Sequence, residues 1–310
     1  MDKMVLGVGQ CCMDYFALSD GFPRENTKQE AIELAIEGGG QVATALVSLA
    51  RLGVGARMVG IVSDDRDGTE IIERFKKEGV STEFIVVRGG GISQRSFIIV
   101  NRQTGTRTIL WQKPTVGVLT EEDIKEDAFS GVDFLLVDGY MKEATLKALS
   151  IARRLGIPAM IDADRMYPGM EELLPLIDYI VGSEDFSRHI DVEPMRALEK
   201  LSASYSHART ITISLGTRGS ITLYEGRLIE QPAFVVEDVV DTTGAGDVFH
   251  GGYIYGLLSG WKIEDTLRFA SAFAALKCRS LSGRKGIPTL EETLRFMKTA
   301  ALRNPVDRPL

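Results

Sequence analysis

The sequence predicts an α/β fold whose central, mostly parallel sheet is flanked by helices on both faces. Short β-rich runs alternate with amphipathic helical patterns over most of the 310 residues, an order typical of parallel strands joined by crossover helices. The strand runs are continuously apolar, which indicates strands covered on both sides. Towards the C-terminus, three helical patterns follow one another without an intervening strand.

The elements of this fold can be placed from hydrophobic periodicity. The predicted strands are Met4–Gly9, Arg57–Val62, Phe134–Asp138, Ala159–Asp162, Tyr179–Val181 and Thr210–Leu215. The predicted helices are Gln41–Leu52, Thr69–Glu78, Lys142–Leu155, Met170–Leu176, Pro194–Leu201, Thr243–Leu258, Ile263–Arg279 and Leu290–Ala301. The sequence shows no linker, internal repeat or low-complexity segment, so we expect a single domain over residues 1–310.

Further β-prone segments interrupt the alternation and predict a small second sheet. Gln94–Val100 and Gly105–Trp111 are joined by Asn101–Thr104, which has hairpin character. Lys28–Glu37 also alternates loosely. We expect a β lid drawn from about residues 12–37 and 91–112, which would exclude water from a site beneath it. An edge decoration of the main sheet is the alternative.

Composition excludes several classes of protein. The net charge of −7 argues against a general nucleic-acid binder, which needs a basic face. No apolar run approaches the ~20 residues of a membrane span, and the N-terminus lacks a signal-peptide layout. The three cysteines and three histidines form no disulfide framework and no zinc spacing. We therefore expect a cytoplasmic protein without a nucleic-acid or membrane partner.

The stretch Asp241–Tyr253 joins a turn of small residues to the start of an apolar helical pattern. Gly244, Ala245 and Gly246 can offer backbone N–H groups to an anion, because such groups at a helix start carry partial positive charge and small side chains permit close approach. Asp247 follows, where a carboxylate can accept a proton from a hydroxyl that attacks a bound phosphate. The alternative is a tight turn and an acidic partner of the helix dipole.

The string from Asp241 to Gly251 resembles the C-terminal signature of the PfkB family of carbohydrate kinases, also called ribokinase-like kinases. The matching positions are Asp241, Thr242, Thr243, Gly244, Ala245, Gly246, Asp247, Phe249 and Gly251. The resemblance implies ATP-dependent phosphorylation of a sugar hydroxyl, with Asp247 as general base and the Gly244–Gly246 backbone as anion hole. It also implies a ribokinase-like fold, magnesium with the nucleotide, and a β lid that in many members forms the dimer contact. We therefore expect a homodimer.

The same resemblance implies a sugar site in the N-terminal part of the chain. Asp14 follows Gly9 as the family's first sugar contact does, an aspartate that accepts hydrogen bonds from substrate hydroxyls; a turn residue is the alternative. Gly7–Gly9 also begins like a dinucleotide-binding fingerprint. The third glycine is missing and Met13–Phe16 is not a helix start, so an oxidoreductase is disfavoured.

A glycine-rich segment, Gly38–Gly40, precedes the first long helix and resembles the family's first signature, in which a glycine pair lies close to the sugar. The asparagine of that signature falls at Thr44, a departure that bears on substrate choice. A preceding asparagine and a basic lid residue complete the set. The predicted substrate-binding residues are Asp14, Asn26, Gly39, Gly40, Thr44 and Arg107.

Two glycine-containing loops resemble the nucleotide site of the family. Ser214–Gly219 resembles its T-L-G-x-x-G loop, with serine in place of threonine. Gly283–Pro288 resembles the loop that closes around adenine and helps to coordinate a monovalent cation; a plain basic loop is the alternative. The predicted nucleotide-binding residues are Ser214, Gly216, Thr217, Gly219, Gly283 and Gly286.

The cation sites are less clearly marked in the sequence. Family members usually carry N-x-x-E where this chain reads Ser183-Glu184-Asp185-Phe186. Glu184 and Asp162 are the candidates for organising magnesium, through water, since Mg²⁺ keeps several waters and binds few carboxylates directly. The resemblance further implies a potassium site at Asp241 and Thr243.

Several substrates fit the resemblance. We favour a ketohexose or a ribose-like sugar, because the lid segments look ketohexokinase-like. The tail from Ala275 to Pro288 instead looks like kinases of fructose derivatives with an anion at carbon 6, and a nucleoside is a further alternative. Thr44 and the missing N-x-x-E motif also leave open a sugar- or nucleoside-binding regulator without turnover.

Overall fold

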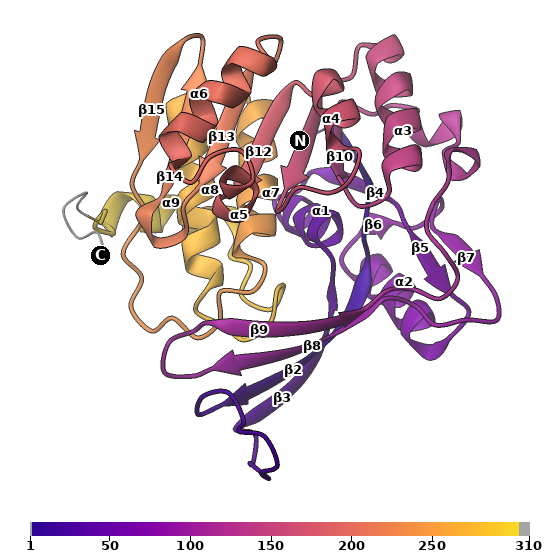
Figure 1. Cartoon of the computed structure of the whole chain (residues 1–310), viewed down its shortest axis with the longest axis vertical. Coiled ribbons are helices and arrows are strands. Elements are labelled where there is room, and N and C mark those ends of the chain that lie inside the picture. Colours follow the sequence, from indigo (N-terminus) through magenta and orange to yellow (C-terminus); the bar gives the residue numbers. More distant parts are fainter. Residues whose placement is uncertain (1, 304–310) are drawn as a thin grey trace.

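The computed structural model describes residues 2–303 and confirms the α/β fold (Figure 1). Its central sheet has nine strands in the order β15-β14-β13-β12-β11-β10-β1-β4-β6. Neighbouring strands from β6 to β13 pair in parallel, and β14 and β15 add an antiparallel edge. The strands are β1 (Met4–Val8), β4 (Gly55–Val59), β6 (Val80–Ser81), β10 (Phe134–Asp138), β11 (Ala159–Ala163), β12 (Tyr179–Ser183), β13 (Thr210–Ser214), β14 (Ser220–Tyr224) and β15 (Arg227–Gln231).

Helices cover both faces of this sheet. They are α1 (Gln41–Arg51), α2 (Arg66–Lys77), α3 (Lys142–Leu155), α4 (Met170–Leu173), α5 (Glu184–Arg188), α6 (Pro194–Ser204), α7 (Ala245–Leu258), α8 (Ile263–Lys277) and α9 (Leu290–Thr299). Apolar side chains of α1, α2, α7 and α8 share one core with the sheet, and those of α3, α4, α5 and α6 share the other. Alternate residues of one strand enter different cores, such as Val5 and Leu6 of β1. This explains why the strands are apolar throughout.

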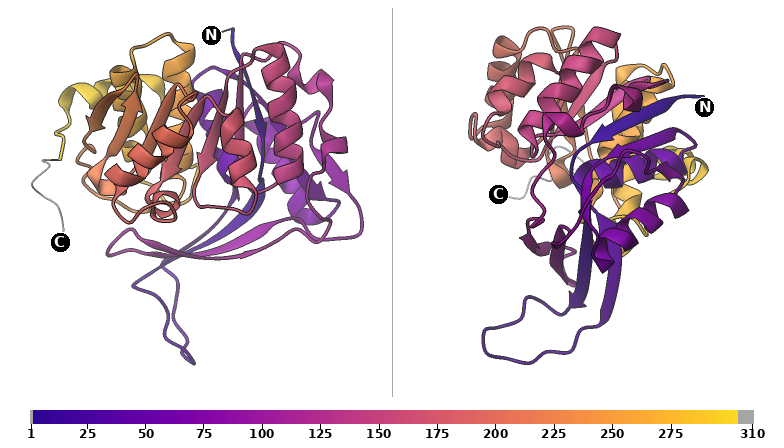
Figure 2. Two further views of the ribbon diagram at one scale, coloured as in Figure 1. Left: turned by 45° about the horizontal axis from the view of Figure 1, so that its top comes forward. Right: turned by 90° about the vertical axis from the view of Figure 1, so that its right-hand side faces the viewer.

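A separate four-stranded sheet, which we call the lid, lies against one edge of the body (Figure 1). Its order is β3-β2-β8-β9, and its strands are β2 (Cys12–Ser19), β3 (Glu33–Gly39), β8 (Arg95–Asn101) and β9 (Arg107–Gln112). The β8–β9 hairpin is confirmed, whereas β2 pairs with β8 in parallel. Figure 2 shows that the loop between β2 and β3 reaches away from the body.

One predicted strand proves to be two. Arg57–Val62 divides at Gly60 into β4 of the central sheet and β5 (Ile61–Ser63), which pairs with β7 (Val86–Arg88) in a sheet of its own. A continuous apolar run does not reveal such a change of partner. Among residues 2–303, no helix combines the length and apolar character that crossing a membrane requires.

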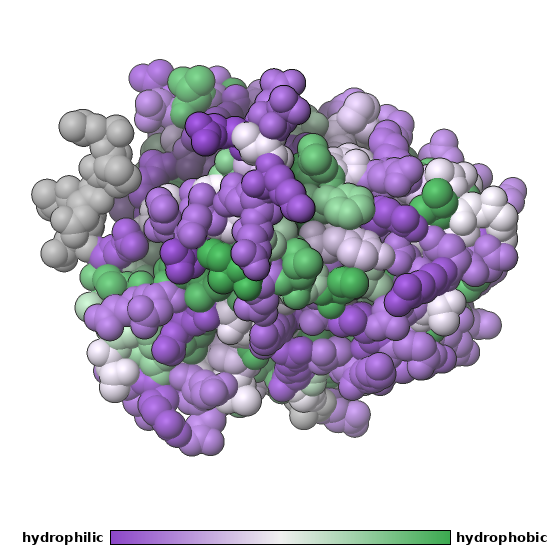
Figure 3. Space-filling model, turned by 90° about the horizontal axis from the view of Figure 1, so that it is seen from below, coloured by the Kyte–Doolittle hydropathy of each residue, from purple (hydrophilic) through white to green (hydrophobic). Residues whose placement is uncertain are grey.

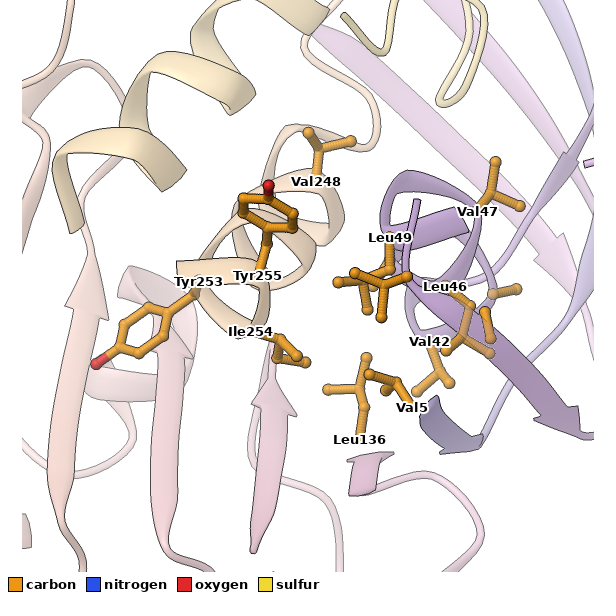
Figure 4. Close-up of a cluster of buried hydrophobic side chains, with 14 of the residues drawn as sticks. Val5, Val42, Leu46, Val47, Leu49, Leu136, Val248, Tyr253, Ile254 and Tyr255 are labelled. Carbon is orange, nitrogen blue, oxygen red and sulfur yellow. The ribbon is translucent and has the colours of Figure 1, made fainter. Parts of the chain in front are cut away.

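Helix α7 is buried along most of its length and is held on several sides. Figure 4 shows its apolar side chains close to those of α1 and to Val5 and Leu136 of the sheet. Small residues allow this close packing: a Cβ on Gly251 would lie 1.8 Å from Ser48 Oγ of α1, and one on Gly252 would lie 3.0 Å from Ala270 Cα of α8. The core therefore fixes the first turn of α7 and the residues that it carries.

Candidate active site

The carboxyl ends of neighbouring parallel strands bring acidic and polar side chains to one edge of the sheet. Asp138 is the last residue of β10, Asp162 is the next-to-last residue of β11, and Ser183 is the last residue of β12. Asp138 is fully buried, and its carboxylate accepts hydrogen bonds from the N–H groups of Gln10 (2.7 Å) and Tyr140 (3.1 Å). Burial raises the pKa of Asp138 to about 7. Ligands bind at this edge of open α/β sheets.

The turn into α7 has the geometry of an anion cradle. Gly244 adopts φ +77° and caps the helix, and Gly246 is exposed, with nothing within 4 Å of the place where a Cβ would lie. The N–H groups of a first helical turn have no acceptor within the helix. The predicted cradle of Gly244, Ala245 and Gly246 lies at this helix start. The N–H of Ala245 donates to the carbonyl oxygen of Thr242 at 3.3 Å, and Gly246 is the exposed part of this partly positive backbone.

Asp247 lies in the first turn of α7, among the other charged groups of the site. Burial raises the pKa of Asp247 to about 8; the charges of Asp162 and Asp14 raise it further, and those of His250 and Arg107 lower it. Two predicted sugar contacts and one predicted metal ligand thus lie close enough to act on this carboxylate. A carboxyl group tuned to near-neutral pH is suited to accept a proton.

We predict a rising pH profile from this shift. In the free protein Asp247 holds its proton below about pH 8, and a general base acts only after losing it. The value of kcat/KM, which reports the free enzyme, should therefore increase as the pH rises through about 8. Steady-state rates across this range at constant ionic strength check the prediction, and a flat profile would contradict it.

A histidine that the sequence analysis did not single out links Asp162 to the helix. His250 Nδ1 lies 2.7 Å from the carbonyl oxygen of Gly246 and 3.3 Å from Asp162 Oδ2, while Nε2 lies 3.3 Å from the carbonyl oxygen of Val181. Burial lowers the pKa of His250. Gln41 Nε2 also approaches Asp162 Oδ1 at 3.4 Å. Asp162 is thereby oriented beside the cradle.

The predicted sugar contacts Asp14 and Gly39 lie against each other. A Cβ on Gly39 would lie 2.0 Å from Asp14 Oδ2, so only glycine fits there. Asp14 lies inside β2, not in a turn after a strand, and pairs across the sheet with Glu37. Burial raises the pKa of Asp14. Gly40, at φ +94°, then starts α1 beside the carbonyl oxygen of Gln10.

Thr44 is buried on α1 and contacts Arg284, a residue of the predicted nucleotide loop Gly283–Pro288. Arg284 Nε donates to Thr44 Oγ1 at 3.3 Å, and Nη2 donates to the carbonyl oxygen of Gly39 at 3.1 Å. The Arg284 side chain is buried, and its guanidinium lies 5.3 Å from the centre of the Phe75 ring. Arg284 thus links the glycine-rich segment Gly38–Gly40 to helix α1.

The structure brings one of the two remaining predicted sugar contacts to the site. Arg107, at the start of β9, donates from Nη1 to Thr242 Oγ1 at 3.1 Å and lies within reach of the charge of Asp247. Asn26 is exposed, with φ 57°, in the loop between β2 and β3 that Figure 2 shows extending from the body. Asn26 therefore lies apart from the other predicted sugar contacts and is a turn residue with left-handed backbone.

The two predicted nucleotide loops have different surroundings. In the first, Ser214 ends β13, while Gly216 and Thr217 are exposed. Gly219 (φ +94°) is required by packing, because a Cβ would lie 2.0 Å from the carbonyl oxygen of Gln231. In the second, Gly283 lies against Gly244, whose added Cβ would be 2.8 Å from it. The second loop therefore borders the cradle, whereas the first follows the end of β13, where Ser214 pairs with Ser183 of β12.

Glu184 is not available as predicted. Its carboxylate pairs with Arg188 at 2.7 Å and with Arg218 at 2.7 Å, so two guanidinium groups already satisfy it. Asp162 keeps its place as a candidate, and Asp164 joins it, because Asp164 Oδ1 is buried without a hydrogen-bond partner. Burial raises the pKa of Asp162, and the charges of Asp164 and Asp138 add to the rise. Such mutual repulsion fits residues that face a bound cation.

The match to known proteins covers nearly the whole chain. A model described as "pfkB family carbohydrate kinase" matches residues 2–290. The chain belongs to the pfkB family of carbohydrate kinases. It is accordingly an ATP:sugar phosphotransferase with an alcohol group as acceptor. The resemblance drawn from the Asp241–Gly251 string is confirmed.

Curated relatives have several sugar specificities. The chain is 26% identical to 5-dehydro-2-deoxygluconokinase of Geobacillus thermodenitrificans, over 97% of this chain and 95% of that protein. It is 25% identical to mouse ketohexokinase, over 92% of this chain and 99% of that protein. A 5-dehydro-2-deoxygluconokinase of Clostridium perfringens is 30% identical over 84% of this chain and 83% of its own length.

Solved structures confirm the ribokinase fold. A putative ribokinase from Agrobacterium tumefaciens superposes with a TM-score of 0.89 at 31% identity, covering 96% of this chain and 97% of that one. Ribokinase from Thermotoga maritima gives a TM-score of 0.81 at 26% identity, covering 96% and 100%. A putative ribokinase II of E. coli, solved in complex with ATP and Mg²⁺, shares the fold with a TM-score of 0.83 at 20% identity.

Proposed function

We propose that this kinase transfers the terminal phosphoryl group of ATP to a hydroxyl of an uncharged sugar, a ketohexose or a ribose-like sugar. One observation carries the proposal: Asp247 lies in the first turn of α7, beside an open backbone cradle and within reach of the charge of Asp14. The cradle is suited to the phosphoryl group and Asp14 to the hydroxyls of the acceptor.

Each residue then has a distinct task. Asp14 accepts hydrogen bonds from the sugar and orients it under the lid. Asp247 takes the proton of the attacking hydroxyl, and the N–H groups of Gly244, Ala245 and Gly246 stabilise charge on the phosphoryl group. Magnesium would supply charge neutralisation at the nucleotide phosphates, with Asp162 and Asp164 as the residues that hold its water shell.

The choice of an uncharged sugar rests on the state of the two arginines near the site. Arg284 is buried and donates to Thr44 and Gly39. Arg107 donates to Thr242 through Nη1 and keeps its other N–H donors, so it is the cation that an anionic sugar would have to draw from this contact. An anionic group on the sugar would need a cation free to pair with it. The buried carboxylates Asp14 and Asp138 also disfavour a nearby anion.

A panel of acceptors tests the proposal. ADP release is measured with ATP, Mg²⁺ and each of fructose, ribose, fructose 6-phosphate, 5-dehydro-2-deoxygluconate and adenosine. We expect the highest kcat/KM with fructose or ribose. Preference for an acidic acceptor would establish the anionic alternative, and preference for adenosine the nucleoside alternative. Binding without ADP release from any acceptor would favour a regulator.

We also propose a homodimer formed through the outer face of the lid. Strand pairing places Ile36, Tyr15, Phe97 and Leu110 in one row across all four strands. Ile36, Phe97 and Leu110 are 50%, 54% and 65% exposed, and Leu34, two residues along β3, is 75% exposed. Figure 3, seen from the side of the lid, shows hydrophobic residues gathered within a polar surface. A second copy would bury this apolar row.

We predict that charges on this row abolish the dimer. The double variant Phe97→Glu, Leu110→Glu should sediment as a monomer, because association would bury two unpaired carboxylates. Val192→Glu is the matched control, since Val192 is 78% exposed but lies outside the lid. Sedimentation velocity distinguishes the outcomes, and a monomeric wild type would contradict the proposal.

A further inference from the structure

A buried lysine lies directly behind the anion cradle. Lys277 is the last residue of α8, and its side chain is fully buried. Its ammonium Nζ donates to the main-chain carbonyl oxygen of Asp241 at 3.0 Å and to that of Thr243. Lysine is almost never fully buried unless it is paired. The burial of this charged side chain against two carbonyl oxygens therefore needs an explanation.

The segment that receives the ammonium is the one that forms the cradle. Asp241 is fully buried, and its Oδ1 accepts from Thr243 N (2.8 Å) and Thr243 Oγ1 (2.7 Å). Its Oδ2 accepts from the N–H of Ser282 at 2.9 Å, across in the second nucleotide loop. Gly244 follows Thr243 at once. A cation at the Asp241 and Thr243 carbonyls thus holds the entrance to α7 in place.

The surrounding charges favour the ammonium form. Burial lowers the pKa of Lys277, and the neighbouring Asp241 carboxylate is the strongest influence in the opposite direction. Among the hydrogen bonds of the described residues, the carboxylate of Asp241 accepts only from N–H and hydroxyl donors, and Lys277 bonds to the main-chain carbonyl oxygen of the same residue. The buried positive and negative charges therefore balance each other within one segment.

These contacts disagree with the potassium site that the resemblance implies. That site was predicted at Asp241 and Thr243, and the carbonyl oxygens of both residues already bond to Lys277 Nζ. A potassium ion and an alkylammonium carry the same charge, and both are attracted to carbonyl oxygens. The two cannot occupy one position, so the residues present do not fit a potassium ion there.

We propose that the ammonium of Lys277 acts as a covalently attached monovalent cation for the cradle, and that this kinase needs no potassium. Lys277 is a positioning residue, since it acts on Thr243 and, through it, on Gly244. The second nucleotide loop is tied to the same place: a Cβ on Gly286 would lie 2.6 Å from the carbonyl oxygen of Lys277. The activity readout rests on the proposed function, whereas the stability readout below does not.

The wild type is tested first in potassium, sodium and tetramethylammonium chlorides at equal ionic strength. We expect kcat to differ by less than about twofold and Tm to be unchanged between the three salts, because an ion without a site stabilises nothing. A several-fold increase of kcat, or a rise of Tm, in potassium alone would overturn the proposal. The Tm comparison decides the matter even where none of the acceptors tried is phosphorylated.

Two variants distinguish a role of the positive charge of Lys277 from a role of its volume. Lys277→Ala opens space for a small ion, and Lys277→Met fills nearly the same volume without charge. Both should lose about 10²-fold in kcat through misplacement of the cradle. Potassium or ammonium, but not tetramethylammonium, should then raise both kcat and Tm of Lys277→Ala and leave Lys277→Met unchanged. Full activity of Lys277→Met, or no response of folded Lys277→Ala to either ion, would show a purely structural lysine.

Discussion

Replacing Asp247 by asparagine should lower kcat by about 10²- to 10⁴-fold, the usual contribution of a general base. The amide keeps the size of the side chain but cannot accept the proton of the acceptor hydroxyl. The KM for ATP should change little, because the cradle N–H groups of Gly244–Gly246 remain. Steady-state kinetics with a saturating acceptor measure both quantities.

A matched variant controls for the electrostatics of a helix start. Asp265 is the third residue of α8, as Asp247 is of α7, and it is exposed. Asp265→Asn should leave kcat unchanged. The pKa shift also predicts the stability of this variant: the folded protein raises the pKa of Asp247 from 3.8 to about 8, so the free energy of unfolding falls as the pH rises between these values and the loss is complete above about pH 8. The asparagine variant should be at least as stable there, and equal turnover would remove Asp247 as the base.

Replacing Gly244 by alanine should lower kcat by about 10²- to 10³-fold, the cost of losing an anion-hole donor. Gly244 adopts φ +77°, and an added Cβ would lie 2.8 Å from both Cα and the carbonyl oxygen of Gly283. Neither backbone atom can yield as a flexible side chain would. The turn must therefore shift, which displaces the N–H groups that face the phosphoryl group.

Gly260→Ala provides the comparison for this variant. Gly260 has a similar φ of +70°, but nothing lies within 4 Å of its added Cβ. It should lose about 1–2 kcal/mol of stability from left-handed strain and keep its activity. Thermal unfolding and kcat are measured for both variants. If Gly244→Ala retained wild-type kcat, the cradle would not stabilise the transferred group.

The sequence predicted the central sheet well where the apolar pattern of a segment matches its burial in the fold. Phe134–Asp138 and Lys142–Leu155 have the predicted bounds, since a short apolar run buried on both faces is followed by a helix that ends at left-handed Gly156. The sequence indicated a lid drawn from about residues 12–37 and 91–112, and β2 lies in the first of these ranges, but the sequence did not reveal how the lid strands pair. Cys12–Ser19 is the inner strand of a sheet whose partners come from Glu33–Gly39 and Arg95–Asn101, and no local signal marks such pairing.

In the candidate site, too, the sequence predicted the residues that are adjacent in the chain and missed those that meet only in the fold. The cradle and Asp247 are contiguous in sequence, and their geometry follows from one turn. Arg284 contacts Thr44, 240 residues away, and Lys277 contacts Asp241, 36 residues away. These partners meet only after the helices pack. Glu184 was predicted because its segment corresponds to the family's N-x-x-E motif, and that resemblance could not show that Arg218 would pair with its carboxylate.

The contact between the lid and the cradle segment has a consequence for how the two substrates bind. Gly105, in the turn of the β8–β9 hairpin, accepts from Thr242 N at 3.2 Å and from Thr242 Oγ1 at 3.1 Å. An acceptor sugar that draws the hairpin inward must also pull on the residue two positions before Gly244. We therefore expect binding of the acceptor to change the affinity for ATP, and by reciprocity ATP should change the affinity for the acceptor by the same factor.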